Sequence, residues 1–273
     1  MTATLNVPQS ETLGPRPGFG DTLRAEWTKL WTVRSTWWTL LAVLAVTVGL
    51  GLLVSGATVA RWDHLSLERR LTIDPTAQSL VGLMLSQLII GVLGVLIITS
   101  EYATGMIRST FAASPHRRQV LGAKAISVSG PVFVVAVVAA LLAFLAGQAI
   151  FAGKGIGVSL GAPGEWRAIV GAGVVLMLES LIALGLGVII RHTAGAVATY
   201  VGVLLVAPLI LGALPDPWGR DITEYFPFTA GRALMKIHMT PDLLPPAAGL
   251  AVLCGWAVAV LGVGAWLIGR RDA

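Results

Sequence analysis

Few residues of this chain combine the types and the spacing that catalysis needs. A nucleotide-hydrolysing phosphate loop ends in Gly-Lys-Ser or Gly-Lys-Thr, but the only Gly-Lys pair, Gly153 and Lys154, is followed by Gly155. The four histidines are scattered, without the His-Glu-x-x-His spacing of a zinc site. We therefore expect no catalytic residues, no metal site and no ATP hydrolysis by this chain itself.

Glu179 is the one ionisable residue well inside a long apolar run. Placing a carboxylate at that depth costs on the order of 3 kcal/mol on insertion scales, so we expect the group to be protonated or partnered. One interpretation is a site for a coupling proton or cation. The other is a polar contact between helices, with Ser180, Gln87, Gln148 or a second protomer as the partner. Glu179 is thus a candidate intramembrane polar site.

The segment from Glu101 to Lys124 is the most informative polar stretch. It holds four basic residues and one acid, which suits contact with anionic lipid or with an acidic protein groove. Ser114 followed by Pro115 is typical of a helix start, so we expect a short cytoplasmic helix after Pro115. The alternative is that the bases only fix the orientation of the chain in the membrane.

These residues must be positioned by helices that cross a membrane. Of the 273 residues, 55% are hydrophobic and 12% charged, whereas soluble domains carry about a quarter charged residues. Six apolar runs match the thickness of a bilayer: 38–59, 80–99, 128–151, 168–190, 195–214 and 246–268. We expect an all-α membrane protein with six transmembrane helices. Its single cysteine, Cys254, excludes an intrachain disulfide.

The basic residues predict the orientation of these spans. Of the 19 Lys and Arg residues, 11 fall on the side that holds both termini and eight on the other, where eight acids match them. Cytoplasmic loops retain Lys and Arg, so we expect both termini in the cytoplasm and the chain in the plasma membrane. The basic charge then reflects membrane topology, and we expect membrane lipids and no nucleic acid as partners.

Outside the spans, three segments have distinct patterns. Residues 1–18 are polar and proline-rich, which predicts a disordered cytoplasmic tail. Residues 19–36 have apolar side chains at helical spacing, which predicts an amphipathic interfacial helix before a six-span domain at 37–273. The long loop 215–245 contains the apolar stretch Tyr225–Phe228, too short to span the membrane, so we expect a candidate re-entrant element between spans 5 and 6.

Several motifs together resemble a known family. The stretch E-Y-A-T-G-M-I-R-S-T from Glu101, followed by S-P-H-R-R-Q-V-L-G-A-K from Ser114, resembles the first cytoplasmic loop of ABC-2-type transporter permeases, especially actinobacterial drug-export types. R-H-T-A-G-A-V from Arg191 and Y-F-P-F-T-A-G-R-A-L from Tyr225 are similar to the same family in order and position. The likeness covers about residues 20 to 270.

The resemblance implies a membrane-spanning permease subunit of an ATP-binding cassette exporter. Such a subunit forms the translocation path as a dimer with a second permease protomer, and separate ATPase subunits bind the ATP and Mg. The implied coupling helix lies between spans 2 and 3, and the implied ATPase-contact residues are Glu101, Gly105, Arg108, Pro115, Arg117 and Arg118.

Two other functions remain as alternatives. A proton-coupled secondary transporter would use Glu179 as its proton site. A membrane enzyme acting on lipid is disfavoured because no nucleophile, base and metal cluster can be assembled from the sequence.

Overall fold

A computed structural model describes residues 18–114, 116–215, 218–237 and 243–271 of the chain. Every regular element in these ranges is a helix, and six helical segments are long and apolar enough to cross a membrane. They are α2 (Arg34–Ala60), α5 (Leu83–Ala103), α7 (Arg117–Ala152), α8 (Glu165–Ile190), the α9–α10 segment (Thr193–Leu211) and α13 (Pro246–Arg270). The expected all-α architecture with six spans is confirmed. The predicted tail lies outside the described residues, except for its last residue, Gly18.

Shorter helices precede the first span or connect the spans. They are α1 (Phe19–Thr32), the 3-10 turn η1 (Trp62–His64), α3 (Leu67–Thr72), α4 (Pro75–Ser79), α6 (Met106–Ala113), α11 (Trp218–Thr223) and α12 (Pro227–Met235). For two of them, the local sequence explains why the helix begins where it does. Ser66 caps α3 through its side chain, and Asp74 accepts two backbone N–H groups at the start of α4, where Pro75 occupies the first helical position.

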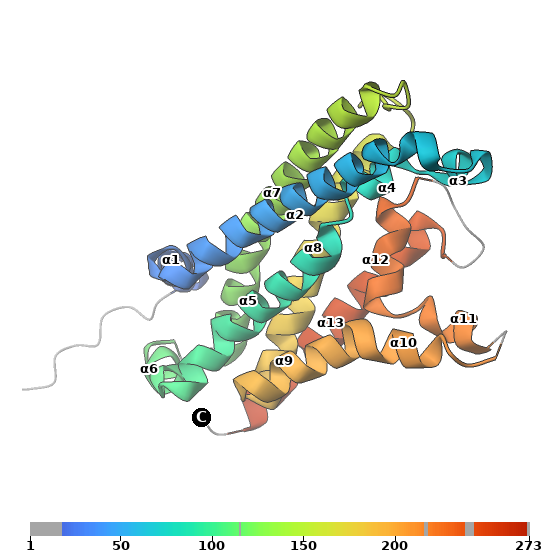
Figure 1. The fold of residues 1–273 in the computed structure, drawn as a ribbon. Helices are drawn as coiled ribbons and strands as arrows, with labels where there is room; N and C mark the ends of the chain where they lie inside the picture. The colour runs from blue at the N-terminus through green and yellow to red at the C-terminus, as the bar shows by residue number, and fades with distance from the viewer. Residues whose placement is uncertain (1–17, 115, 216–217, 238–242, 272–273) are drawn as a thin grey trace, which may run out of the picture.

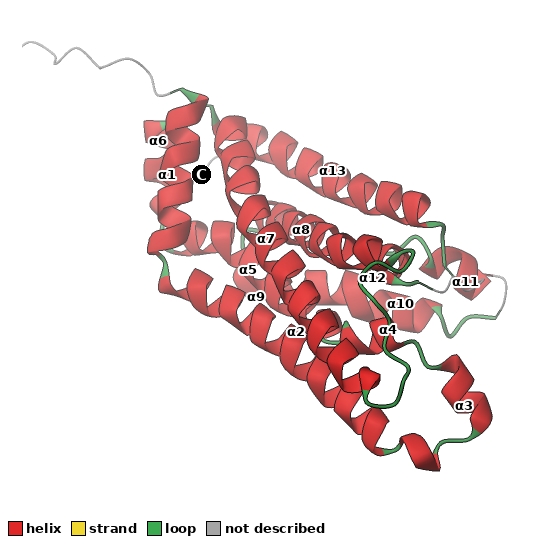
Figure 2. Cartoon of the chain, turned by 90° about the horizontal axis from the view of Figure 1, so that it is seen from above, coloured by secondary structure: helices red, strands yellow, loops and turns green. Residues whose placement is uncertain are grey.

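The two ends of the bundle carry different elements. Figure 1 shows α1, α6 and the C-terminal end of α13 at one end, and α3, α4 and α11 at the other. Figure 2, seen from above, shows the same separation. We call the first the inner end, because the sequence predicts it to face the cytoplasm, and the second the outer end. Both described chain ends lie at the inner end, as an even number of crossings requires.

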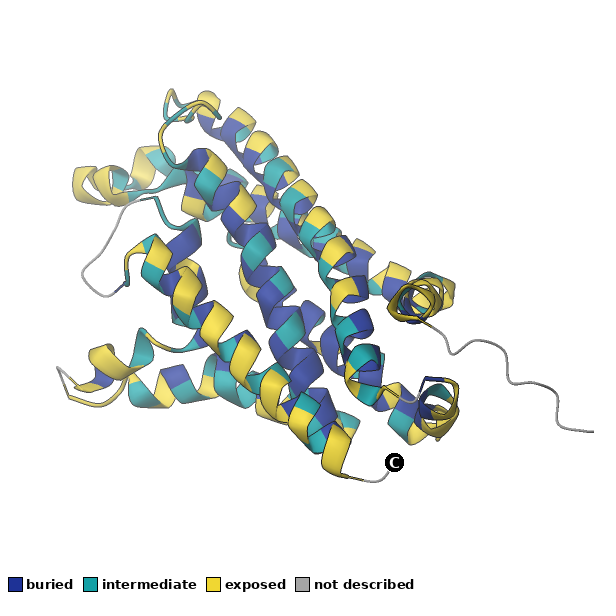
Figure 3. Ribbon diagram, turned by 180° about the vertical axis from the view of Figure 1, so that it is seen from behind, coloured by how far each residue is buried: buried dark blue, intermediate teal, exposed yellow. Residues whose placement is uncertain are grey.

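α8 is the central helix of the bundle. It is the most buried of the six spans, and α5, α7, α12 and α13 pack around it. Figure 3 shows the buried residues concentrated in the middle of the bundle and the exposed ones on the outer helices. Exposed apolar side chains such as Leu53 and Val258 are what a lipid-facing surface requires.

Small residues allow the close approach of α2, α4 and α7. The small residues Ala139, Ala143 and Gly147, spaced four apart in α7, are buried. A Cβ atom on Gly147 would collide with the Ser79 side chain of α4, and one on Gly51 of α2 would collide with the Ser79 carbonyl and lie 3.5 Å from Ala143 Cβ. Without a hydrophobic driving force between helices in lipid, such close packing is a main source of association.

The fifth span is interrupted by a wide turn. α9 (Thr193–Val201) passes into a π-helical segment, η2 (Gly202–Val206), and then into α10 (Ala207–Leu211). Ala207 N–H bonds to the Gly202 carbonyl, one residue farther back than in an α-helix. Pro208 has no N–H for the Leu204 carbonyl, so the widened turn lies where the α-helical ladder is already broken.

α12 packs inside the outer half of the bundle. Its Gly231 faces Val175 of α8, and its Ala230 carbonyl approaches so close to Gly249 of α13 that a Cβ there would lie 2.6 Å away. Arg167 of α8 donates hydrogen bonds to the Ala233, Leu234 and Lys236 carbonyls at the C-terminal end of α12. The apolar stretch Tyr225–Phe228 thus leads into a helix held between two spans.

The structure corrects the predicted helix after Pro115. The short helix of this loop is α6, which ends at Ala113, before Pro115, and the residues from Arg117 onward belong to the 36-residue helix α7. Gly105, in the left-handed conformation at φ 72°, separates α5 from α6, and Ser114 is extended. Pro115 itself lies outside the described residues.

The boundary between the first helix and the first span also differs from the prediction. α1 ends at Thr32, Val33 adopts an extended conformation, and α2 begins at Arg34 instead of near residue 37. The buried side of α1 is formed by Thr22, Glu26 and Leu30. Trp27 is largely exposed. α1 therefore packs against the protein through a partly polar stripe and not through its tryptophans alone.

Candidate functional site

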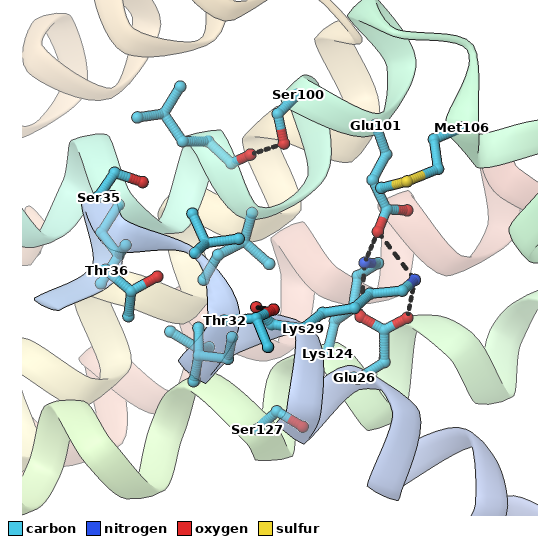
Figure 4. A pocket seen from close by; sticks show the side chains of 16 residues that line it. Glu26, Lys29, Thr32, Ser35, Thr36, Ser100, Glu101, Met106, Lys124 and Ser127 are labelled. Carbon is cyan, nitrogen blue, oxygen red and sulfur yellow. Dashed lines mark hydrogen bonds and ion pairs between the residues drawn. The ribbon is translucent and has the colours of Figure 1, made fainter.

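Four charged side chains from three helices meet at the inner end. They are Glu26 and Lys29 of α1, Glu101 at the end of α5 and Lys124 of α7, and we call them the charge cluster (Figure 4). Lys124 Nζ lies 2.7 Å from Glu26 Oε2 and 2.6 Å from Glu101 Oε1. Lys29 Nζ lies 2.8 Å from Glu26 Oε1 and 3.1 Å from Glu101 Oε1. The cluster joins α1 to both spans that flank α6.

Most of the charge cluster is buried. The side chains of Lys124, Glu26 and Glu101 are 1%, 5% and 4% exposed, whereas that of Lys29 is 37% exposed. Two positive and two negative charges balance, which is the condition for keeping ions out of water. Removing one partner of a buried pair costs about 3–5 kcal/mol, because the remaining charge is left uncompensated. The cluster therefore makes the position of α1 strongly dependent on α5 and α7.

Lys29 is held in its charged form. Its burial alone would lower the pKa, but the hydrogen bonds to Glu26 and Glu101 and the charges of these two carboxylates outweigh burial, and the pKa of Lys29 is raised. Lys29 also donates to Thr110 Oγ1 of α6 over 3.4 Å. The lysine thereby connects α6 to the charge cluster.

α6 is a short amphipathic helix on the surface of the inner end. Ile107 and Phe111 are buried beneath it, and Arg108 is exposed on its other side. Gly105 before it is exposed too, and a Cβ atom there would touch nothing within 4 Å. Gly105 and Arg108, both expected at a contact with an ATPase, thus lie on an accessible surface.

Glu101 departs from that expectation. Its side chain is buried in the charge cluster and does not reach the surface where a partner would sit. The sequence placed it at the start of a polar loop, but α5 continues to Ala103, and the last turn of this helix directs Glu101 toward Lys124. Glu101 is therefore a residue that holds α5 against α1 and α7.

The two arginines after Pro115 have different environments. Arg117 donates from Nη1 to the carbonyls of Ile268 and Arg271, at the C-terminal end of α13, and its guanidinium lies 5.2 Å from the Phe111 ring centroid. A cation at a helix C-terminus is favoured by the helix dipole. Arg118 is exposed. Of this pair, Arg118 is the one that is accessible to a partner. Arg117 instead connects α7 to α13 through its hydrogen bonds.

Glu179 lies within α8, the most buried of the six spans. It is fully buried, and neither carboxylate oxygen has a hydrogen-bond partner among the described residues. Nearby, Tyr200 of α9 covers Gly91 of α5 with its ring and donates from its hydroxyl to the Gln87 carbonyl over 3.1 Å. Ser180, offered as a partner of Glu179, instead donates to the Met177 carbonyl. Within the described ranges, the bundle therefore encloses a carboxyl group that has no hydrogen-bond partner.

Sequence reasoning missed the charge cluster as a unit. Glu26 and Lys29 are three residues apart, which alone signals an intrahelical pair. Their partners Glu101 and Lys124 follow 72 and 98 residues later in the chain. The one signal in the sequence was an acid, Glu26, within the predicted amphipathic helix.

Comparison with protein families gave no match for this chain, and comparison with curated proteins gave none either.

Proposed function

We propose that this chain is the membrane-spanning permease subunit of an ATP-binding cassette exporter. Two permease protomers would form the translocation path, and separate ATPase subunits would bind ATP and Mg and supply the energy. The motifs from Glu101 to Lys124, from Arg191 and from Tyr225 support the family. The plasma membrane, with both termini in the cytoplasm, is the location that the basic residues favour.

The observation that carries the proposal is the linkage of α6. This helix exposes Arg108 at the inner end, and Lys29 joins it to a cluster that also holds α1, α5 and α7. A partner pressing on α6 would act on two spans and on the entry helix together, because buried packed elements shift as units. This is the mechanical property that a coupling helix needs.

Two further elements fit the same function. α1 would lie in the membrane interface as an amphipathic helix, since its exposed Trp27 suits the headgroup region and its Thr22 and Glu26 face protein. α12 would be a re-entrant element, since it packs between α8 and α13 and returns to the outer end before α13 begins.

Purification with a partner tests the proposal. The tagged chain is extracted from its native membrane in mild detergent, and quantitative mass spectrometry measures the soluble ATPase that accompanies it. We expect a stoichiometric ATPase with the wild type and its loss in the double variant Arg108→Glu, Arg118→Glu. Arg69→Glu, which reverses an exposed charge on α3 at the outer end, is the matched control and should retain the ATPase. Arg117 is left unchanged because it holds α13.

A second function has one specific observation in its favour. Glu179 is a fully buried carboxyl group with no partner on either oxygen in the described part of the chain, as a proton site of a secondary transporter would be. Liposomes holding the purified chain alone separate the two functions. Transport driven by a proton gradient without ATPase, abolished by Glu179→Gln in a folded protein, would establish the secondary transporter and overturn the permease.

A further inference from the structure

A pocket lies between α2 and α3 at the outer end, and we call it the arginine pocket. It encloses about 480 Å³, within the size range of small-molecule sites. Leu53, Val54 and Ala57 of α2 form its apolar part. Arg61, the residue after α2, and Arg69 of α3 form its basic part. Of the described residues that line it, two are cationic and none is acidic.

The arginine pocket separates α3 from the rest of the bundle. No residue of α3 is buried, although a helix of six residues needs contacts with other groups to be stable in water. Figure 2 shows α3 set apart from the long helices at the outer end. Arg69 and Thr72 of this helix line the pocket. A molecule in the pocket would therefore supply contacts that α3 lacks.

The charges of the two arginines are not compensated by the described residues. Arg61 and Arg69 are exposed, and within the described ranges their guanidinium groups take part in no ion pair or hydrogen bond. Asp63, close to Arg61 in sequence, pairs with Lys154 over 2.8 Å. Glu68 precedes Arg69 in α3 but does not line the pocket, since adjacent residues of a helix do not face each other. Both guanidinium groups are therefore available to an anion.

The depth of the arginine pocket defines the other half of its ligand. Leu53 precedes Arg61 by eight residues, which is about 12 Å along the helix axis. Leu53 is exposed on a helix long and apolar enough to cross the membrane, so this part of the pocket opens to lipid. Guanidinium groups bind phosphate through paired hydrogen bonds. The pocket therefore matches a molecule that joins a phosphate group to an apolar chain.

We propose that the arginine pocket binds an anionic phospholipid of the leaflet at the outer end. The phosphate lies between Arg61 and Arg69, and one acyl chain lies along Leu53, Val54 and Ala57. A lipid with net negative charge is favoured over a zwitterionic one, because no acid lines the described part of the pocket to receive a choline or ethanolamine cation. The inference does not rest on the proposed function, because it concerns binding to this chain alone.

Native mass spectrometry tests the class of lipid. The purified chain in detergent is supplied with equal amounts of phosphatidylglycerol and phosphatidylcholine that carry the same acyl chains. We expect phosphatidylglycerol to be retained at least about fivefold more strongly, the factor that one arginine near a membrane surface contributes for an anionic lipid. Equal retention of the two lipids would show that the charge of the headgroup is not recognised, and preference for phosphatidylcholine would reverse it. Either outcome would overturn the proposal.

Charge reversal shows whether the two arginines hold the lipid. Arg61→Glu and Arg69→Glu should each weaken the retention of phosphatidylglycerol by at least about tenfold, because an attraction is replaced by a repulsion. Arg220→Glu on α11, at the same end, is the matched control and should retain the lipid, since Arg220 already lies 3.6 Å from Asp221. Unchanged retention in the double variant of Arg61 and Arg69 would overturn the site.

Arg69→Glu also separates this inference from the proposed function. The arginine pocket lies at the outer end and α6 at the inner end (Figure 1). Arg69→Glu should therefore lose the lipid and still retain the ATPase. Loss of the ATPase from the wild type would overturn the permease and leave the lipid site in place.

Photo-crosslinking in nanodiscs tests the place of the acyl chain and keeps both arginines. Phosphatidylglycerol and phosphatidylcholine that carry a diazirine in one acyl chain are compared, and the labelled peptides are identified by mass spectrometry. We expect the phosphatidylglycerol probe to label residues 53–58 more strongly than the phosphatidylcholine probe does. Ala57→Trp, which fills the apolar part of the pocket, should remove this excess. Ala45→Trp, an exposed position on α2 that does not line the pocket, is the matched control. Equal labelling by both probes, or an excess that persists in Ala57→Trp, would overturn the proposal.

A soluble competitor distinguishes the lipid from a free phosphate ester. Glycerol phosphate carries the same anionic group without acyl chains. We expect it to leave the retention of phosphatidylglycerol unchanged at millimolar concentration, because much of the pocket is apolar. Displacement of the lipid by glycerol phosphate would identify a soluble phosphate ester as the ligand and would overturn the lipid site.

Discussion

Lys124 is the residue on which the charge cluster depends most. Its side chain is 1% exposed and is the buried cation that Glu26 and Glu101 share. Lys124→Met would leave two buried carboxylates with only the half-exposed Lys29. We expect a loss of about 3–5 kcal/mol of stability, seen as a lower melting temperature in detergent.

Two comparisons show whether charge is the cause. Lys154→Met removes a lysine from an exposed pair and should change the melting temperature little. Adding Glu101→Gln to Lys124→Met should recover part of the lost stability, because it removes one uncompensated charge. Equal losses in Lys124→Met and Lys154→Met would contradict a buried cluster.

The contribution of Lys29 to the stability of the charge cluster is lost at alkaline pH. Its carboxylate partners raise its pKa above the ordinary value of 10.5, so its contribution to stability is complete below pH 10.5 and is lost as pH rises through the higher, folded-state pKa. We expect the difference in melting temperature between wild type and Lys29→Met to be constant up to about pH 10 and to shrink above pH 10.5. A difference that grows with pH would contradict the pairing.

The sequence alone identified polar residues of the inner end but did not show which of them contact one another. Gly105, Arg108 and Arg118 are exposed, as a contact with a partner would require. Glu101 was assigned to the same surface, although it points inward. The difference depends on where α5 ends and how it is rotated, and a single sequence does not fix helix rotation.

At the scale of elements, the joint between α5 and α6 depends on Gly105. Its φ of 72° is unfavourable for any residue with a Cβ atom, while the space around it is empty. Gly105→Ala should therefore cost about 1 kcal/mol through backbone strain alone. Gly130→Ala, in the interior of α7 with equally empty surroundings, should instead stabilise by about 0.5–1 kcal/mol. Melting temperatures that move in the same direction would contradict this account.

The long spans were predicted from the sequence more accurately than the turns and short helices. Long apolar runs identify spans because the bilayer sets their length, so five of the six spans are uninterrupted helices close to the expected positions. The π-helical turn before Pro208 was not predicted, since a proline in an apolar run does not tell which neighbouring turn widens. The helix expected after Pro115 instead precedes it, because α7 extends continuously from Arg117.

At the scale of the whole molecule, the separation of the two ends gives a test of orientation. In a Cys254→Ala background, Leu67→Cys reports the outer end and Arg108→Cys the inner end, and both residues are exposed. We expect a membrane-impermeant maleimide to label Leu67→Cys in intact cells and Arg108→Cys only after permeabilisation. The reverse pattern would place both termini outside the cell and would contradict the orientation predicted from the basic residues.

The order of synthesis also determines when the ion pairs of the charge cluster can form. Lys124 leaves the ribosome 98 residues after Glu26, which at 5–20 residues per second is a delay of about 5 to 20 s. Until Glu101 is made, 72 residues after Lys29, Glu26 and Lys29 have only each other, as an i,i+3 pair within α1. α1 can therefore complete its ion pairs only after the second span and the beginning of the third have been synthesised.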